Sequence, residues 1–541
     1  MKKSKKLLLA FIIITLVQVA IIIFWGFRKE NLYWDEFYTL EGAHYFSSSN
    51  AEEHYIDEDP DYKIGEWLPV SYVMDTLIVG KEESLFNESL TKVFKKLTGY
   101  HNYSAYLNLA ESILSPGRFS IWPSIILNII FFIVNQKVLF SMCKRLSDNE
   151  TFPVAVCSMY GFSSICVSMA LFIRHYMLAT LLVSLFTFFH VLYYDENGDS
   201  GTAHIKRIVC FAIAVGALYV AHNVAQYCVI YGVLFVVAFS ILLLIKKGIK
   251  RFLHYSVPMY GGGFFYIYSQ TEYLKYLFDF QKSHSEANTA AAATLDGIAE
   301  FKLSYLPDRF LEMGQIVGRY LYGSFFVMVA ILCVAILAVI IRYVGKTTDE
   351  KMVRWSPFAV VPSVVALLYI LFFAAFGLYE QVRYISFVFP ELAIASMVLI
   401  YTAFRTDKYK YSLVAATILV IIVSVNFKGK VDMLYTGDRV SMETVRAFGA
   451  DSYILHAGNH RTSITYAAAL VAEDGDEFFV YDDLKDGELE NLENNLRDKM
   501  ILVGYYGVST EDVQDMLKDN GYKVDWIADT YNNVFFTAVR E

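Results

Sequence analysis

Long apolar runs alternate with short polar loops over most of the chain. Most of these runs are about 18–25 residues long, enough for an α-helix to cross the roughly 30 Å hydrocarbon core of a bilayer. Charged residues are rare inside the runs and gather between them. The pattern predicts a mostly α-helical, polytopic membrane protein with about eleven transmembrane helices, at residues 6–27, 119–143, 152–173, 176–194, 208–221, 224–245, 252–269, 316–343, 357–378, 384–404 and 411–426.

The first apolar run follows the basic sequence MKKSKK, so it has the outline of a signal peptide. It is longer than the apolar region of a typical signal peptide, and no small-residue cleavage site precedes Trp25. We therefore interpret it as an uncleaved first span with its basic end in the cytoplasm.

Basic residues concentrate in the loops on one predicted side of the membrane. They lie, together with the N-terminal lysines, at residues 144–145, 204–207, 246–251, 342–354 and 405–410. Because cytoplasmic loops are enriched in Lys and Arg, this side is predicted to be the cytoplasm. The opposite side then receives three large segments: a loop at 28–118, a loop at about 270–315 and the region that begins at about 427.

The C-terminal region differs in pattern from the rest of the chain. Strand-like segments such as EFFVYDD and KMILVGYYG alternate with the helical segment TEDVQDMLKDNGY. The pattern indicates a transmembrane module at 1–426 and a small extracytoplasmic α/β domain at 427–541. In the first loop, SLFNESLTKVFKKLTGY is amphipathic and is predicted to lie in the plane of the membrane interface.

Composition narrows the class of partner. Hydrophobic residues make up 56% of the 541 residues and charged residues 19%, and the net charge is −9. Without a basic stripe outside the short loops, this balance argues against nucleic acid and leaves membrane lipids as the expected surroundings. The six cysteines lie in or beside apolar runs without CxxC spacing, so neither a zinc site nor a disulfide scaffold is indicated.

Two adjacent acids, Asp35 and Glu36 in WDEFYTL, directly follow the first span. Carboxylates so close to a bilayer are costly, which makes them candidates for catalysis. Three other turns on the same predicted side carry the remaining candidates, which are Arg174, His175 and Tyr176, His222, and Arg383 and Tyr384. A guanidinium matches phosphate oxygens and a carboxylate can accept a proton, so the group suits a lipid-linked phosphate substrate.

Each candidate also has an ordinary structural interpretation. The acids could be solvated residues beside a span, the arginines could anchor helix ends or form ion pairs, and the tyrosines could belong to an aromatic belt. The histidines could be hydrogen-bonded residues at helix ends. The acidic run at 52–62 is either a divalent-cation site or a solvated loop, and we interpret it as the loop.

The ordered motifs are similar to those of a known family. WDEFYTL resembles the acidic signature in the first outer loop of the GT-C glycosyltransferases, in the branch of the protein O-mannosyltransferases and the lipid A aminoarabinose transferase. Three later segments resemble elements of the same branch, over about residues 1–405 in all: 115–132, the Arg-x-Tyr-x-Leu hinge in 170–186, and the Arg-Tyr…Pro element in 383–394. The His-Pro-Pro-Leu-Tyr element of the branch is absent, and LPVSY at 68–72 is its nearest counterpart.

The resemblance implies an inverting glycosyltransferase that moves a sugar from a polyprenyl-phosphate carrier to an extracytoplasmic lipid, glycopolymer or protein. Asp35 would be the general base, and Glu36 would support it or position the acceptor. The donor phosphate would be bound by Arg174 and Arg383, with His175 and Tyr384, while His222 and Tyr176 would line the pocket. No metal or other cofactor is expected, although some relatives use a divalent cation.

Three other functions remain open. A transporter or flippase of lipid-linked sugars would place charges near the bilayer midplane, whereas here the charges flank the spans. An O-antigen-type polymerase or ligase would use outer arginines without needing the acid pair. A membrane anchor for the C-terminal domain would not need eleven spans.

Overall fold

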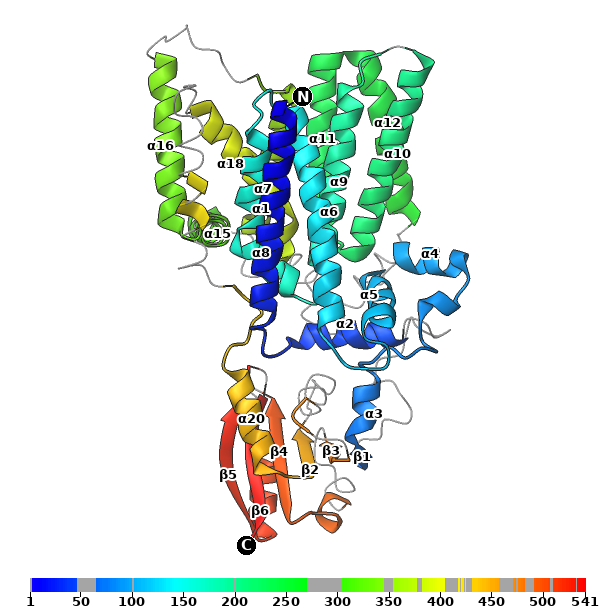
Figure 1. Cartoon of the computed structure of the whole chain (residues 1–541), viewed down its shortest axis with the longest axis vertical. Coiled ribbons are helices and arrows are strands. Elements are labelled where there is room, and N and C mark those ends of the chain that lie inside the picture. The colour runs from blue at the N-terminus through cyan, green and yellow to red at the C-terminus, as the bar shows by residue number, and fades with distance from the viewer. Residues whose placement is uncertain are drawn as a thin grey trace. The chain divides into compact units, whose positions relative to one another are not determined.

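Figure 1 shows the computed structural model of the chain. The structure describes residues 2–45, 65–99, 102–198, 200–269, 303–344, 354–376, 382–403, 431–456, 475–481, 491–505, 509–531 and 533–541, with shorter stretches at 417–418, 420–422, 424 and 470–472. The chain divides into two compact units. The helical unit comprises Met1–Ile21, Ile129–Ala170 and His175–Val431, and the sheet unit comprises Ile22–Asn128, Leu171–Arg174 and Asp432–Glu541.

Most of the long helices in the helical unit run roughly parallel or antiparallel to one another, whereas α15 (Leu306–Tyr322) is seen nearly end-on (Figure 1). Three helices, α1, α6 and α8, contribute residues to both units. The helices are α1 (Lys2–Gly26), α6 (Trp122–Leu146), α7 (Phe152–Gly161), α8 (Ser164–Leu171), α9 (Tyr176–Asp195), α10 (Gly201–Val224), α11 (Cys228–Lys247), α12 (Ile249–Ser269), α15 (Leu306–Tyr322), α16 (Phe325–Val344), α17 (Val360–Phe376) and α18 (Phe389–Ala403), with 3₁₀ turns η3 (Leu303–Tyr305), η4 (Pro357–Ala359) and η5 (Val382–Val388).

The predicted mostly helical, membrane-spanning fold is confirmed. Among the described residues, seven helices are long and apolar enough to cross a membrane, or up to nine if each of two bent helix pairs is one span. The predicted span at 252–269 is helix α12, which does not meet that criterion; it carries Pro258 and the glycines at 261–263. Most of the predicted span at 411–426 lies outside the described residues.

Two predicted spans are bent rather than straight. The span predicted at 152–173 is formed by α7 and α8, which meet at 56°, and the one predicted at 316–343 falls on α15 and α16, which meet at 89°. Gly323 ends α15 in the left-handed conformation with φ 76°, which glycine adopts without steric cost. A Cβ on Gly318 would lie 2.6 Å from Cα of Phe325, so the sharp corner also requires glycine there.

The sheet unit combines the loop between α1 and α6 with the C-terminal residues. Its six strands are ordered β1-β3-β2-β4-β6-β5, with β2 parallel to β3 and β4 and the other pairs antiparallel. The strands are β1 (Trp67–Pro69), β2 (Ser452–His456), β3 (Glu477–Tyr481), β4 (Lys499–Tyr505), β5 (Tyr522–Asp529) and β6 (Asn533–Arg540). The helices are α2 (Trp34–Tyr45), α3 (Val70–Asp75), α4 (Leu90–Thr98), α5 (Asn102–Leu114), α20 (Asp438–Phe448) and α23 (Glu511–Asp519), with η2 (Leu85–Asn87).

The predicted C-terminal α/β region is therefore present, and it receives one further strand from the first loop. Trp67 in β1 lies opposite Phe479 in β3, so a strand from far upstream forms an edge of the sheet. The sheet core contains apolar side chains from several strands and from α23, including Ile454, Phe479, Leu502 and Leu517. In Figure 1 α20 lies along the sheet, where it contacts β5.

Helix α4 has one apolar face, which is only partly buried. Val93 and Leu97 pack against the small core formed by Leu85 and Ala105. Leu90 and Phe94, one helical turn apart, are exposed at 88% and 69%. The prediction that this segment lies in the membrane interface would account for the exposed part of this face, and it stays a prediction.

Candidate functional site

The acid pair lies in the first turn of α2, where negative charge interacts favourably with the helix dipole. Because adjacent helical residues point about 100° apart, the two carboxylates face different surroundings. Glu36 is completely buried, whereas the Asp35 side chain retains 19% of its exposure. Only Asp35 can therefore meet a molecule that arrives from outside the protein core.

Glu36 joins three segments of the chain. Its Oε2 accepts hydrogen bonds from Lys29 Nζ at 3.0 Å and from the Tyr33 amide at 2.7 Å, and its Oε1 accepts one from the Ile173 amide at 2.7 Å. The contact with Tyr33, which precedes α2, is the reciprocal half of a capping box and fixes the start of the helix. The contact with Ile173 holds the hinge between α8 and α9 to the same point.

Lys29 and Glu36 form a buried ion pair. Burial raises the pKa of the Glu36 carboxyl and lowers the pKa of the Lys29 ammonium, and the charge of each partner opposes the shift of the other. Desolvation makes such a pair expensive to form, but removing one partner leaves an uncompensated charge and typically costs about 3–5 kcal/mol. The ion pair therefore fixes the segment after α1 to the first turn of α2.

Lys29 also reaches the first residues of the C-terminal segment. Its Nζ donates to the Met433 carbonyl at 2.8 Å and lies 5.1 Å from the ring centroid of Tyr435. Among the described residues, Met433 and Tyr435 are the only non-glycine residues with positive φ, at 67° and 52°. Such conformations cost free energy and persist where surrounding contacts enforce them, so Lys29 lies at a tightly constrained junction.

The structure brings Arg174 to Asp35. Its Nη1 donates to the Asp35 carbonyl and to Thr39 Oγ1, both at 3.0 Å, and its Nη2 lies 3.9 Å from Asp35 Oδ2. The two contacts to α2 fix the guanidinium, and its distance to the Asp35 carboxylate is longer than that of a hydrogen bond. A partly exposed carboxylate can accept a proton, and a fixed guanidinium beside it can hold an anion in the same place.

Two residues that were not predicted from the sequence, Tyr103 and Asn128, connect α5 and α6 to the hinge between α8 and α9. Tyr103 of α5 donates to Asn128 Oδ1 at 3.0 Å, and Asn128 Nδ2 donates to the Phe172 carbonyl at 2.9 Å. Burial strongly raises the pKa of the Tyr103 hydroxyl, which keeps it protonated as a donor. Lys29 was missed as well, because a single lysine after a span looks like an ordinary flanking charge.

The five other predicted site residues belong to the helical unit, and the structure describes them there. Arg383 and Tyr384 lie in η5, where the guanidinium carbon is 5.2 Å from the Tyr384 ring centroid and Nη2 is 3.4 Å from the hydroxyl. His175 and Tyr176 begin α9, with ring centroids 4.5 Å apart. His222, in the last turn of α10, packs edge-on against Tyr266 at 5.6 Å.

The described residues contain no group of three or more His, Cys, Asp or Glu side chains arranged to hold a metal ion. The acidic run at 52–62 lies outside the described residues. Independence from metals and other cofactors stays a prediction.

The fold matches solved structures although the sequence matches no protein-family model and no curated protein. One similar structure is the crystal structure of ArnT from Cupriavidus metallidurans bound to undecaprenyl phosphate, with 12% identity, a TM-score of 0.51 and coverage of 98% of this chain and 97% of ArnT. The apo state of the same ArnT gives 12% identity, a TM-score of 0.50 and coverage of 99% and 98%. The chain thus has the ArnT fold from end to end, which confirms, at the level of fold, the resemblance to the GT-C branch that contains the aminoarabinose transferase.

Proposed function

We propose that this chain is a membrane glycosyltransferase that takes a sugar from a polyprenyl-phosphate carrier and passes it to an acceptor on the extracytoplasmic side of the cell membrane. The observation that carries the proposal is the pairing of Asp35 with Arg174 within an ArnT-like fold. An ArnT of this fold binds undecaprenyl phosphate, which supports a donor of that class. The N-terminus would be cytoplasmic and the C-terminal domain extracytoplasmic.

In the proposed reaction, Asp35 takes the proton from the acceptor hydroxyl or amine as that group attacks the anomeric carbon. The new bond forms on the face opposite the leaving group, so the anomeric centre is inverted. The bond from the anomeric carbon to the phosphate oxygen breaks, and the polyprenyl phosphate leaves with the electron pair. Arg174 stabilises the charge that develops on this phosphate.

The other candidates have supporting roles in this proposal. Arg383, His175 and Tyr384 would bind the donor phosphate, and His222 and Tyr176 would line the pocket. Glu36 would act from the buried side: its two oxygens already accept three hydrogen bonds, so it would fix the geometry around Asp35. No step requires a metal or another cofactor.

The proposal is tested in cells that lack the gene and are complemented with variants of the full chain. Cell-surface glycolipids and glycopolymers are compared by mass spectrometry. The wild-type chain should restore a sugar modification that Asp35→Asn does not restore, although both proteins reach the membrane in equal amounts. Asp75→Asn, which changes an exposed acid at the end of α3, is the matched control and should restore it fully.

Two outcomes would contradict the proposal. Full restoration by Asp35→Asn would remove the base from the mechanism. Accumulation of the lipid-linked sugar on the cytoplasmic leaflet of the deletion strain would instead indicate the flippase, because a missing transferase leaves the donor on the outer leaflet.

A further inference from the structure

The connection between α1 and α2, residues 27–33, leads directly into the helical turn that carries Asp35. Within the sheet unit this connection contacts the C-terminal residues, 432–541, for which no role in the reaction has been given so far. The residues of the connection that make these contacts are Lys29, Glu30, Asn31 and Tyr33.

Asp438, the first residue of α20, is the centre of the polar contacts. Its Oδ2 accepts hydrogen bonds from Asn31 Nδ2 at 2.7 Å and from the Tyr531 amide at 3.0 Å, and the residue is only 8% exposed. Asn31 Oδ1 in turn accepts a hydrogen bond from the Leu32 amide at 2.7 Å. Because hydrogen bonds to a carboxylate are stronger than those between neutral groups, Asp438 ties α20 and the turn between β5 and β6 firmly to the α1–α2 connection.

Glu30 makes a second contact with the same helix. Its Oε2 accepts a hydrogen bond at 2.7 Å from the amide of Gly437, the N-cap residue of α20. The amides at a helix N-terminus lack partners within the helix and carry partial positive charge, so a carboxylate is favourable there. The Glu30 amide also donates to the Leu434 carbonyl at 2.8 Å. Glu30 is thus bound to the C-terminal residues through both its side chain and its backbone.

An aromatic contact joins the same two regions close to the proposed base. The Tyr33 ring centroid lies 6.0 Å from that of Tyr531, which lies 4.7 Å from that of Tyr435. Aromatic pairs at such separations attract each other. Because the Tyr33 amide also binds Glu36, this contact bears directly on where α2 begins.

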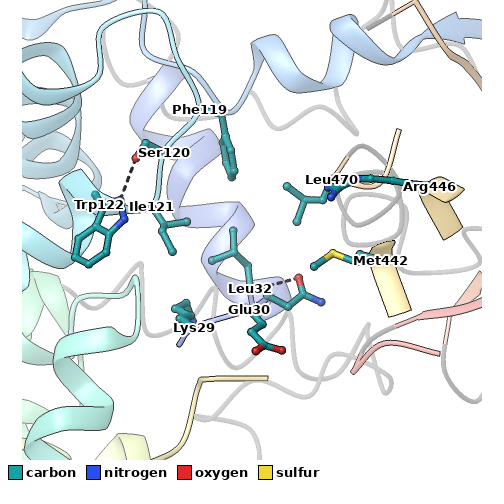
Figure 2. A pocket seen from close by; sticks show the side chains of 11 residues that line it. Lys29, Glu30, Leu32, Phe119, Ser120, Ile121, Trp122, Met442, Arg446 and Leu470 are labelled. Atoms are coloured by element: carbon teal, nitrogen blue, oxygen red, sulfur yellow. Dashed lines mark hydrogen bonds between the residues drawn. The ribbon is translucent and has the colours of Figure 1, made fainter. Parts of the chain in front are cut away.

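Apolar packing between the connection and α20 is incomplete, so the polar contacts matter more. Figure 2 shows Leu32 of the connection and Met442 of α20 in the wall of a pocket of about 350 Å³. Walls separated by such a space lose the dispersion attraction that direct contact would give. The hydrogen bonds of Glu30 and Asn31 therefore carry much of the attachment.

We propose that Asp438 is a positioning residue for the transfer, acting through Asn31 on the first turn of α2 and so on Asp35. The C-terminal region thereby takes part in the reaction without supplying a reacting group. Asp35 and Arg174 lie 3.9 Å apart, so a small rotation of α2 changes their separation directly. A displacement of about 1 Å at a catalytic group can lower a rate about a hundredfold. This inference rests on the proposed function and adds to it the role of the C-terminal region.

The test exchanges the two hydrogen-bonding side chains. Asn31→Asp sets a second carboxylate against Asp438 and should lower the transfer rate per folded molecule about ten- to a hundredfold. Adding Asp438→Asn to Asn31→Asp restores one donor and one acceptor, and should recover most of the rate. Asn31→Ala removes the hydrogen bond without adding a charge, and should lower the rate in the same direction. The rate is that at which the sugar modification reappears in the complemented deletion strain, divided by the amount of folded protein in the membrane.

Two further measurements on the purified full chain separate positioning from a loss of folding. The affinity for undecaprenyl phosphate, measured by native mass spectrometry, should stay near wild type in Asn31→Asp, because Asn128 holds the hinge that carries Arg174. Hydrogen exchange should become faster at residues 33–39 and stay unchanged in α9 and α11. The matched control is Asp512→Ala, which removes an exposed acid from the first turn of α23 and should change none of these quantities.

Three results would overturn the positioning role. The first is a wild-type rate per folded molecule in both Asn31→Asp and Asn31→Ala. The second is a double variant that folds like the wild type but does not recover the rate. The third is a lowered rate without faster exchange at residues 33–39. Absence of transfer by the wild-type chain in the same strain would overturn the proposed function instead, so the two failures are distinguishable.

Discussion

The two ion pairs at the start of α2 differ sharply, although their acids are neighbours in the sequence. Lys29 and Glu36 are 3.0 Å apart with both side chains fully buried. Arg174 and Asp35 are 3.9 Å apart, with 24% and 19% of their side chains exposed. The buried pair has no access to substrate and suits a structural role, whereas the open pair can exchange a water or an anion at low cost.

The two acids of the Asp35-Glu36 dipeptide therefore have different roles. A helix rotates successive side chains by about 100°, so a single turn directs one acid inward and the next outward. The inward acid fixes the connection after α1, the start of α2 and the hinge at residues 171–174 through three hydrogen bonds. The outward acid is thereby held beside Arg174 with part of its side chain exposed.

The largest expected effect on stability comes from breaking the buried pair. Lys29→Met leaves the Glu36 carboxylate buried without a counter-charge and should lower the free energy of unfolding by about 3–5 kcal/mol. Denaturant unfolding of the purified protein measures this loss. The double variant Lys29→Met with Glu36→Gln is the control: it removes both charges and should recover most of the loss. No recovery would mean that the pair itself is not the source of stability.

Substitutions in the Arg174–Asp35 pair should change the affinity for the donor rather than the free energy of unfolding. Arg174→Ala should weaken binding of undecaprenyl phosphate about tenfold or more, because a charge-assisted contact to phosphate is lost. Arg174→Lys should retain part of the affinity. Arg118→Ala, which changes an exposed arginine in the same unit, serves as the control in the same titration. Wild-type affinity in Arg174→Ala would exclude Arg174 from the phosphate site.

Glu111 is a third carboxylate for comparison, because it is buried without a lysine partner. Glu111 in α5 is 3% exposed, its Oε1 has no hydrogen-bond partner among the described residues, and burial raises its pKa well above the ordinary value. The folded protein therefore holds this proton more tightly than the unfolded chain does. Its contribution to stability is present at low pH and is lost as the pH rises from the unfolded pKa through the raised folded pKa.

Glu111→Gln should consequently stabilise the protein at neutral pH and flatten the fall of stability with rising pH. The slope removed is at most about 1.4 kcal/mol per pH unit. Unfolding curves at pH 5, 6, 7 and 8 measure it. A slope that is the same in the variant and the wild type would show that Glu111 does not titrate in this range.

The spans and the acid pair were predictable from the sequence because each depends on local pattern. Apolar length marks a span, and an acid pair beside a span is conspicuous in composition alone. The hinge arginine was predictable in the same way, since Arg174 interrupts an apolar stretch.

The contacts that organise the site depend on chain segments far apart in sequence, and no local pattern encodes them. Lys29 contacts Met433, about 400 residues away, and Trp67 pairs with Phe479 across a similar separation. The sharp corner between α15 and α16 was missed because the predicted apolar run continues through Gly323 and hides the break. Tyr103 and Asn128 were missed because a single tyrosine or asparagine in an apolar surrounding looks like an ordinary core residue.

The most direct test of the account is sugar transfer by Asp35→Asn, measured beside the unfolding free energy of the same protein. We expect transfer to fall by about 10²–10⁴-fold, the usual contribution of a general base, while the unfolding free energy stays within about 1 kcal/mol of wild type. Glu36→Gln, measured in parallel, should lose stability instead. Transfer near the wild-type rate in a folded Asp35→Asn protein would contradict the central claim that the outward acid is the base.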